Sequence, residues 1–151
     1  MIRLIDINEN NWLKIARLQV KEEQKAFVAS PTGIMARAYA MRASNAHALA
    51  ISNEEEVVGV FMVREFQDEP VGYELQQLLI DYRFQNKGYG KQAVQLIIEK
   101  LKQEGKYNSV EVCVKMEDDS AIRVYKKLGF VDSGYIDPEV PDSYNLIYRF
   151  N

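Results

Sequence analysis

Residues 78–91 constrain the fold of this chain more than any other segment. The segment begins as an apolar run at 78–80, passes through a short polar turn, and reaches Gly88 and Gly90, which open a long amphipathic helix. Glycine permits conformations in which successive N–H groups point outwards, and the N-terminus of a helix attracts anions. Lys87 and Lys91 add positive charge on either side. The segment therefore predicts a strand, a turn and a helix start that together bind a pyrophosphate group.

Length and charge narrow the class of protein. The 151 residues predict one domain, 1–151, with an ordinary hydrophobic core. A formal net charge of −3 provides no basic stripe for nucleic acid, and it favours a small cationic partner over a polyanion. The chain has no 18-residue apolar run and no signal-peptide pattern, so we expect no membrane contact and a cytoplasmic location.

The chain has one cysteine, Cys113, and one histidine, His47. These numbers exclude an intrachain disulfide and a cysteine or histidine metal cluster, so no metal is predicted. Cys113 lies in an alternating apolar run, which favours a packing role in the sheet or core.

The apolar pattern predicts a mixed α/β domain. Strands are expected at 3–6, 49–52, 57–63, 71–80, 110–114, 131–136 and 144–150, with turns at 53–56 and 67–70. Helices are expected from Asn8 or Asn11 towards Phe27, over 32–43, from the two glycines to Gly105, and from Asp118 or Asp119 to Leu128. This order predicts a mixed, mostly antiparallel central sheet flanked by helices.

Two common nucleotide motifs do not fit the glycine turn. A P-loop requires a Gly-Lys-Ser/Thr ending, and Gly90-Lys91 is followed by Gln92; a dinucleotide fingerprint requires a glycine where Ala93 stands. Residues 85–90, Gln-Asn-Lys-Gly-Tyr-Gly, instead match the Gln/Arg-x-x-Gly-x-Gly/Ala turn of the GCN5-related N-acetyltransferases. Residues 121–130, with Tyr125 four residues before Gly129-Phe130, resemble a later helix of that family at a similar spacing. Within the family, residues 22–29 are similar to the corresponding segment of bacterial spermine/spermidine acetyltransferases.

The resemblance implies that acetyl-CoA is the co-substrate and locates its contacts. Backbone groups of Leu78 and Ile80 would pair with the pantetheine arm, which requires strand 78–80 to splay from strand 110–114. Gln85, Asn86, Lys87, Gly88, Tyr89, Gly90 and Lys91 would form the pyrophosphate turn, with the Tyr89 side chain more typical of packing. Asp118 stands where the family often has asparagine, so it can accept a hydrogen bond from pantetheine but cannot donate one.

The resemblance also suggests catalytic roles. Glu74 is the candidate base that takes a proton from the amine, directly or through water; the alternative is a solvated strand glutamate. Tyr125 is the candidate acid that protonates the departing sulfur; the alternative is a core tyrosine on the apolar stripe of its helix. The N–H of Leu78 or Leu79 would stabilise the oxyanion.

The acceptor is expected to be a primary amine, most specifically a polyamine such as spermine or spermidine, attacked directly in a ternary complex. Glu22, Glu23 and Phe27 are the candidate substrate contacts, although Glu22 and Glu23 also fit a solvated helix face. Alternative functions are acetylation of an aminoglycoside or a protein amino group, or acetyl-CoA binding without catalysis. A homodimer is expected by family analogy alone.

Overall fold

The computed structural model describes residues 1–54 and 56–151, and their strands form one seven-stranded sheet in the order β1-β2-β3-β4-β5-β7-β6. The strands are β1 (Ile2–Asp6), β2 (His47–Asn53), β3 (Glu56–Phe66), β4 (Gly72–Ile80), β5 (Ser109–Lys115), β6 (Val131–Asp132) and β7 (Ser143–Arg149). Among the strands of these two ranges, only β4 and β5 pair in parallel, which confirms the predicted mixed, mostly antiparallel sheet. Glu55, inside the turn expected at 53–56, lies outside the described residues.

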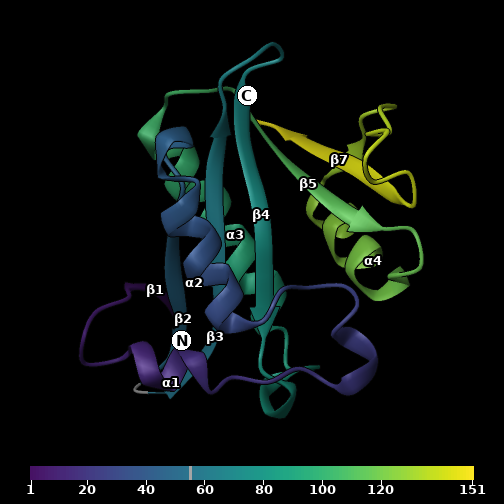
Figure 1. Ribbon diagram of the computed structural model, residues 1–151. Helices are drawn as coiled ribbons and strands as arrows, with labels where there is room; N and C mark the ends of the chain where they lie inside the picture. The colour runs from purple at the N-terminus through teal and green to yellow at the C-terminus, as the bar shows by residue number, and fades with distance from the viewer. Residues whose placement is uncertain (55) are drawn as a thin grey trace.

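Helices cover both faces of the sheet (Figure 1). They are α1 (Trp12–Ala16), α2 (Pro31–Ala40), α3 (Tyr89–Glu104) and α4 (Asp119–Leu128), with 3-10 turns η1 (Glu22–Gln24), η2 (Arg42–Ser44) and η3 (Tyr82–Phe84). α1 and α2 bury residues such as Ile15 and Ile34 in one core cluster, while α3 buries Val94, Ile97 and Leu101 in the other. The apolar stripe predicted for the third helix is therefore confirmed, as is its end at Gly105.

The first predicted helix is wrong in length. α1 ends at Ala16 instead of continuing towards Phe27, and the chain runs as an irregular strap, residues 17–30, that contains only η1. The Gln19 N–H donates to the Asp81 carboxylate at 2.9 Å, and the Gln19 carbonyl accepts from Tyr82 N–H at 2.8 Å. These bonds to the residues after β4 replace helical bonds, so a tertiary contact overrides the local helical pattern.

The strand expected at 131–136 is also too long. β6 ends at Asp132, whose carboxylate accepts a hydrogen bond from Gly134 N–H at 2.8 Å. Gly134 has a positive φ of 80°, which bends the chain away from β7. Residues 133–136 therefore belong to the loop that leads into β7.

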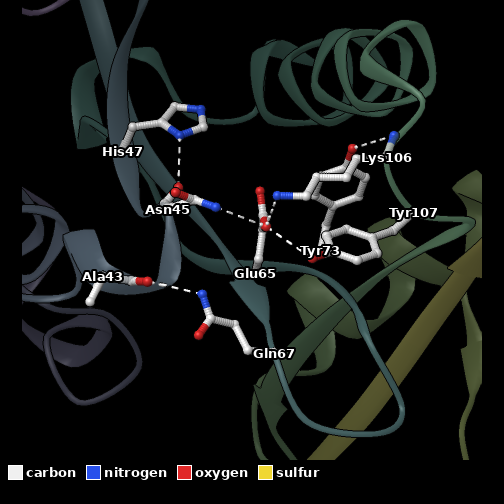
Figure 2. A network of polar contacts seen from close by, with 8 residues as sticks. All are labelled: Ala43, Asn45, His47, Glu65, Gln67, Tyr73, Lys106 and Tyr107. Atoms are coloured by element: carbon white, nitrogen blue, oxygen red, sulfur yellow. Dashed lines mark hydrogen bonds and ion pairs between the residues drawn. The ribbon is translucent and has the colours of Figure 1, made fainter.

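A buried carboxylate fixes the end of the sheet where β4 and β5 are still paired (Figure 2). Glu65 on β3 accepts hydrogen bonds from Lys106 Nζ (2.7 Å), Tyr107 Oη (3.0 Å) and Asn45 Nδ2 (3.1 Å). Burial alone would raise the pKa of Glu65, but these three partners outweigh it and lower the pKa. The network ties the α3–β5 connection to β3.

Candidate active site

The central feature of the site is a gap between β4 and β5. Residues 73–75 of β4 pair with residues 110–112 of β5, and beyond Leu75 the two strands diverge, as Figure 1 shows. The splay that the pantetheine contact requires is therefore confirmed. A cleft of about 510 Å³ occupies the gap, walled by β4, β5, the strap and the start of α4.

Beyond Leu75, the edge of β4 that faces this gap has backbone groups that pair with no strand in the described part of the chain. Asp81 N–H donates to Val58 O on β3 at 2.8 Å, and a Cβ on Gly59 of β3 would collide with the Leu79 carbonyl oxygen. Since backbone groups of successive strand residues point to alternate edges, Leu79 faces β3, whereas Leu78 and Ile80 face the gap. Of the two candidate oxyanion donors, the Leu78 N–H is the one directed into the cleft.

A β-bulge marks the point of divergence. Val63 pairs with Leu75 and Met62 with Gln77, so Gln76 is an extra residue in β4. Its Oε1 is buried and accepts no hydrogen bond from the described residues, although the side chain lines the cleft.

A second cavity of about 300 Å³ lies at the N-terminus of α3 and shares walls with the cleft, including Leu78, Ile80 and Tyr125. Gly88 caps α3 with φ 81°, and Asn86 has φ 63°, so both adopt the left-handed conformation. No side chain in the described part of the chain caps this helix, and its first turn carries no acidic residue. The unpaired N–H groups and the helix dipole together suit an anion.

The residues of the predicted pyrophosphate turn differ in their surroundings. Lys91 and the backbone of Gly90 line the second cavity, whereas Lys87 projects into solvent outside its walls. Tyr89 Oη accepts a hydrogen bond from Asn53 Nδ2 at 2.8 Å, so its side chain packs towards the end of β2. An added Cβ at Gly90 would meet nothing closer than Ile80 Cγ1 at 3.7 Å, which leaves the space in front of the helix open.

Gln85 connects the turn to its surroundings. Its Nε2 donates to Ile80 O at 2.9 Å, and its amide exchanges two hydrogen bonds of 3.0 Å with Gln24 of the strap. The strap is held again where Ala29 N–H donates to Gln77 Oε1 at 2.8 Å. The two glutamines therefore hold the strap against β4 and the α3 turn.

Tyr125 and Asp118 meet at the wall between the two cavities. Tyr125 is 6% exposed, its ring packs edge-on against Phe130 at 5.2 Å, and its hydroxyl finds no hydrogen-bond partner among the described residues. Burial and the nearby Asp118 carboxylate raise the pKa of Tyr125, which keeps the phenol protonated. Asp118 caps α4 by accepting from Ala121 N–H at 3.2 Å, which confirms the predicted helix start.

Glu74 directly precedes Leu75, the first β4 residue that lines the cleft, and lies in the part of β4 that still pairs with β5. It is 8% exposed and forms an ion pair with Arg64 on β3. Burial raises the pKa of Glu74, the Arg64 guanidinium opposes this rise, and the Asp137 carboxylate adds to it. Burial and Glu74 likewise raise the pKa of Glu111 on β5. Glu74 is thus a buried, paired glutamate, and the solvated alternative is wrong.

The remaining candidate residues separate into two groups. Phe27 and Glu23 on the strap line the cleft, whereas Glu22 is exposed and pairs with Lys25 at 2.8 Å. The prediction that Cys113 packs in the sheet or core is wrong, because its side chain is exposed and lines the cleft. The alternation of β5 buries Val112 and Val114 and turns Cys113 to the other face, where partial desolvation by the cleft walls raises the thiol pKa.

Several residues of the site carried no signal in the sequence. Gln24 and Gln77 have side chains of ordinary solvent-exposed type, and only their contacts with Gln85 and with the backbone of the strap make them part of the site. Asp81, 1% exposed, accepts from Gln19 N–H and Arg83 N–H and so orients the turn after β4. Its position directly after an apolar run was the one available hint.

Comparison with known proteins places this geometry in context. Residues 12–130 match the profile of the acetyltransferase (GNAT) family. Comparison with curated protein sequences gives no match. No group of three or more His, Cys, Asp or Glu side chains in the described ranges is arranged to hold a metal ion. No helix within them is long and apolar enough to cross a membrane.

The fold is similar to that of several solved structures. An aminoglycoside acetyltransferase in complex with coenzyme A has a TM-score of 0.80 at 14% identity, with 99% of this chain and 95% of that chain covered. An acetyltransferase from Agrobacterium tumefaciens has a TM-score of 0.77 at 15% identity, covering 98% and 90%. The PaiA N-acetyltransferase from Thermoplasma acidophilum in complex with coenzyme A has a TM-score of 0.70 at 15% identity, covering 99% of each chain. At these identities the likeness is one of fold.

Proposed function

Because the chain belongs to the acetyltransferase (GNAT) family, we propose that it transfers the acetyl group of acetyl-CoA directly to a primary amine, preferably a polyamine such as spermine or spermidine. The observation that carries this proposal is the continuity between two cavities. One presents an uncapped helix N-terminus, and the other runs along the free edge of β4. Together they suit a ligand with a pyrophosphate at one end and a long amide-bearing arm.

The pyrophosphate would bind the N–H groups of residues 86–91, with Lys91 beside them. The pantetheine amides would pair with the backbone of Leu78 and Ile80, in the manner of an added strand. The Ile80 carbonyl already accepts from Gln85, so the gap-facing groups without a partner among residues 1–54 and 56–151 are Leu78 N–H, Leu78 C=O and Ile80 N–H. Asp118 retains acceptor capacity beyond its cap and can receive an amide N–H.

The reaction requires three groups from the protein: a base for the amine, a hydrogen-bond donor for the oxyanion and a hydrogen-bond donor for the departing sulfur. An alkylamine resembles lysine, with a pKa of about 10.4, so it must lose a proton before it attacks. Glu74, whose pKa is raised, receives that proton directly or through water. The Leu78 N–H stabilises the oxyanion, and as the C–S bond breaks, the Tyr125 hydroxyl donates to the sulfur.

The acidic surroundings support a cationic acceptor. The Asp137 carboxylate raises the pKa of Glu74, and Glu74 raises the pKa of Glu111, while Glu23 lines the strap side of the cleft. Phe27 on the same side offers an apolar surface to the methylene spacer of a polyamine. The attacking amine must be neutral, so it gains little from nearby carboxylates. A second ammonium group on the same molecule keeps its charge, and its attraction to these carboxylates strengthens binding.

A substrate panel tests the proposal. Thiol release from acetyl-CoA is measured with spermidine, spermine, an aminoglycoside and a lysine-containing peptide, and the polyamines are expected to give the highest kcat/KM. Activity confined to the peptide or the aminoglycoside would overturn the polyamine assignment. Binding of coenzyme A by calorimetry, without turnover of any amine, would instead indicate a non-catalytic module.

A further inference from the structure

Gln76 occupies the apex of the gap between β4 and β5. Leu75 and Val112 form the last pair of the parallel ladder, and Gln76 and Cys113 are the first residues beyond it. The bulge leaves Gln76 without a Cα partner on β3. Its side chain therefore lies where the two strands begin to separate, on the cleft wall.

The side-chain oxygen of this residue is unusual. Among the side-chain nitrogen and oxygen atoms of residues 1–54 and 56–151, Gln76 Oε1 is the one that has almost no solvent-accessible surface of its own and no hydrogen bond. About nine in ten buried polar atoms in proteins have a partner, and an orphan is destabilising. The neighbouring Gln77 has its oxygen satisfied by Ala29 N–H. An unpaired acceptor at the apex is therefore suited to a ligand that donates.

We propose that Gln76 Oε1 accepts a hydrogen bond from an N–H of the acceptor amine and so orients the nitrogen lone pair towards the thioester. This inference rests on the proposed function and adds a substrate-contacting residue to it. The terminal amide torsion is soft, so a small rotation presents the oxygen to the cleft. Gln76 lines the cleft together with Phe27 and Val28 of the strap and, within the described residues, lies outside the second cavity, which favours the amine over the cofactor as its partner.

A neutral acceptor suits this position. As the C–N bond forms, the nitrogen gains positive charge and its N–H becomes a stronger donor, so the bond to Gln76 strengthens in the transition state. After Glu74 has passed the first proton to solvent, the nitrogen of the adduct loses one further proton to this base, and the C–S bond breaks to release the thiolate. The proton shared with Gln76 stays on nitrogen and becomes the amide N–H of the product. A carboxylate here would hold the amine as ammonium and oppose its deprotonation.

Two near-isosteric variants test the contact. Gln76→Met removes the acceptor oxygen, and kcat/KM for the amine should fall about 10- to 100-fold, with the acetyl-CoA KM unchanged. Gln76→Glu keeps an acceptor, so the amine KM should not rise, but kcat at pH 7 falls and the acid limb of its pH profile moves to higher pH. Both variants retain the other titratable and charged groups that line the cleft, which are Glu23, Cys113, Glu117, Asp118, Asp119, Arg123 and Tyr125. They also retain Glu74, whose charge acts on the Cys113 thiol.

Gln77→Met is the matched control. It breaks the bond to Ala29, so the unfolding temperature should fall by about 2–6 °C, and the acid limb should stay in place. Gln76→Met removes an unsatisfied buried group and should melt no lower than the parent.

Three results would overturn the inference. The first is a kcat/KM for the amine in Gln76→Met that lies within twofold of the parent value. The second is a KM for the amine that rises as much in Gln76→Glu as in Gln76→Met. The third is an acid limb of the pH profile that does not move in Gln76→Glu. If the parent itself turned over no amine, the proposed function would fail instead, which separates the two outcomes.

Discussion

Replacing Tyr125 by Phe isolates the contribution of one hydroxyl group. The ring packs edge-on against Phe130 and is almost fully buried, so phenylalanine preserves the packing. The hydroxyl has no hydrogen-bond partner in the described part of the chain, so its loss leaves no protein group unsatisfied. Stability should therefore be unchanged or slightly higher in the variant.

The size of the kinetic effect follows from two pKa values. A thiol has a pKa of about 8.5 and a tyrosine about 10, and burial and Asp118 raise the pKa of Tyr125 further. Complete proton transfer to the thiolate is thus uphill, and the hydroxyl acts mainly as a hydrogen-bond donor to the developing charge. A hydrogen bond to a charged group contributes about 1.5–3 kcal/mol, so kcat should fall about 10- to 150-fold.

The assay is steady-state thiol release, combined with thermal unfolding and acetyl-CoA titration. The expected pattern is a lower kcat with unchanged acetyl-CoA affinity and unchanged unfolding temperature. An unaltered kcat would remove Tyr125 as the donor. A fall in kcat accompanied by lower stability or weaker acetyl-CoA binding would show that the residue acts through packing.

Three further predictions concern the base, the glycine turn and the buried carboxylate. Glu74→Gln should lower kcat/KM about 10²- to 10⁴-fold. It should also abolish the acid limb of the pH–rate profile, which lies above the ordinary carboxyl range in the parent because the pKa of Glu74 is raised. A variant whose pH–rate profile equals that of the parent would show that Glu74 is not the base. Gly88→Ala and Gly90→Ala should each weaken acetyl-CoA binding roughly tenfold, but only Gly88→Ala, at φ 81°, should also lose about 1–2 kcal/mol of stability; equal unfolding temperatures for the two contradict this. The lowered pKa of Glu65 means that its stabilisation is present above the unfolded-state pKa and lost as pH falls, so the unfolding free energies of parent and Glu65→Gln should converge between pH 7 and pH 3; a constant difference contradicts the network.

The interpretation of the sequence succeeded where local chemistry controls conformation. The apolar stripe of α3 and the glycines at its two ends predict the helix, because period and turn geometry are local properties. Asp118 caps α4 for the same reason. The order of strands and helices then implies the mixed sheet, and the two motifs imply the family.

The sequence was misleading where distant residues compete with local preference. Unbroken alternation would place Leu75 and Leu79 on one face of β4, but the bulge at Gln76 sends Leu75 to the α3 core and Leu79 to the α1–α2 core. The strap was likewise predicted to continue the first helix, but the Gln19 N–H donates to the Asp81 carboxylate instead of making a helical hydrogen bond. The path of the strap depends on a hydrogen bond between residues 62 positions apart, and the bulge depends on the pairing of β4 with β3. Neither is contained in a local sequence pattern.

By itself, the sequence determined where the glycine turn lies and where α3 begins, because glycine conformation and helix start are set within a few residues. Only the tertiary structure decided how far β4 and β5 diverge, which strap glutamine meets Gln85, and that Cys113 faces the cleft. These features arise where two strands stop pairing, and strand pairing depends on the packing of the whole sheet rather than on either strand alone.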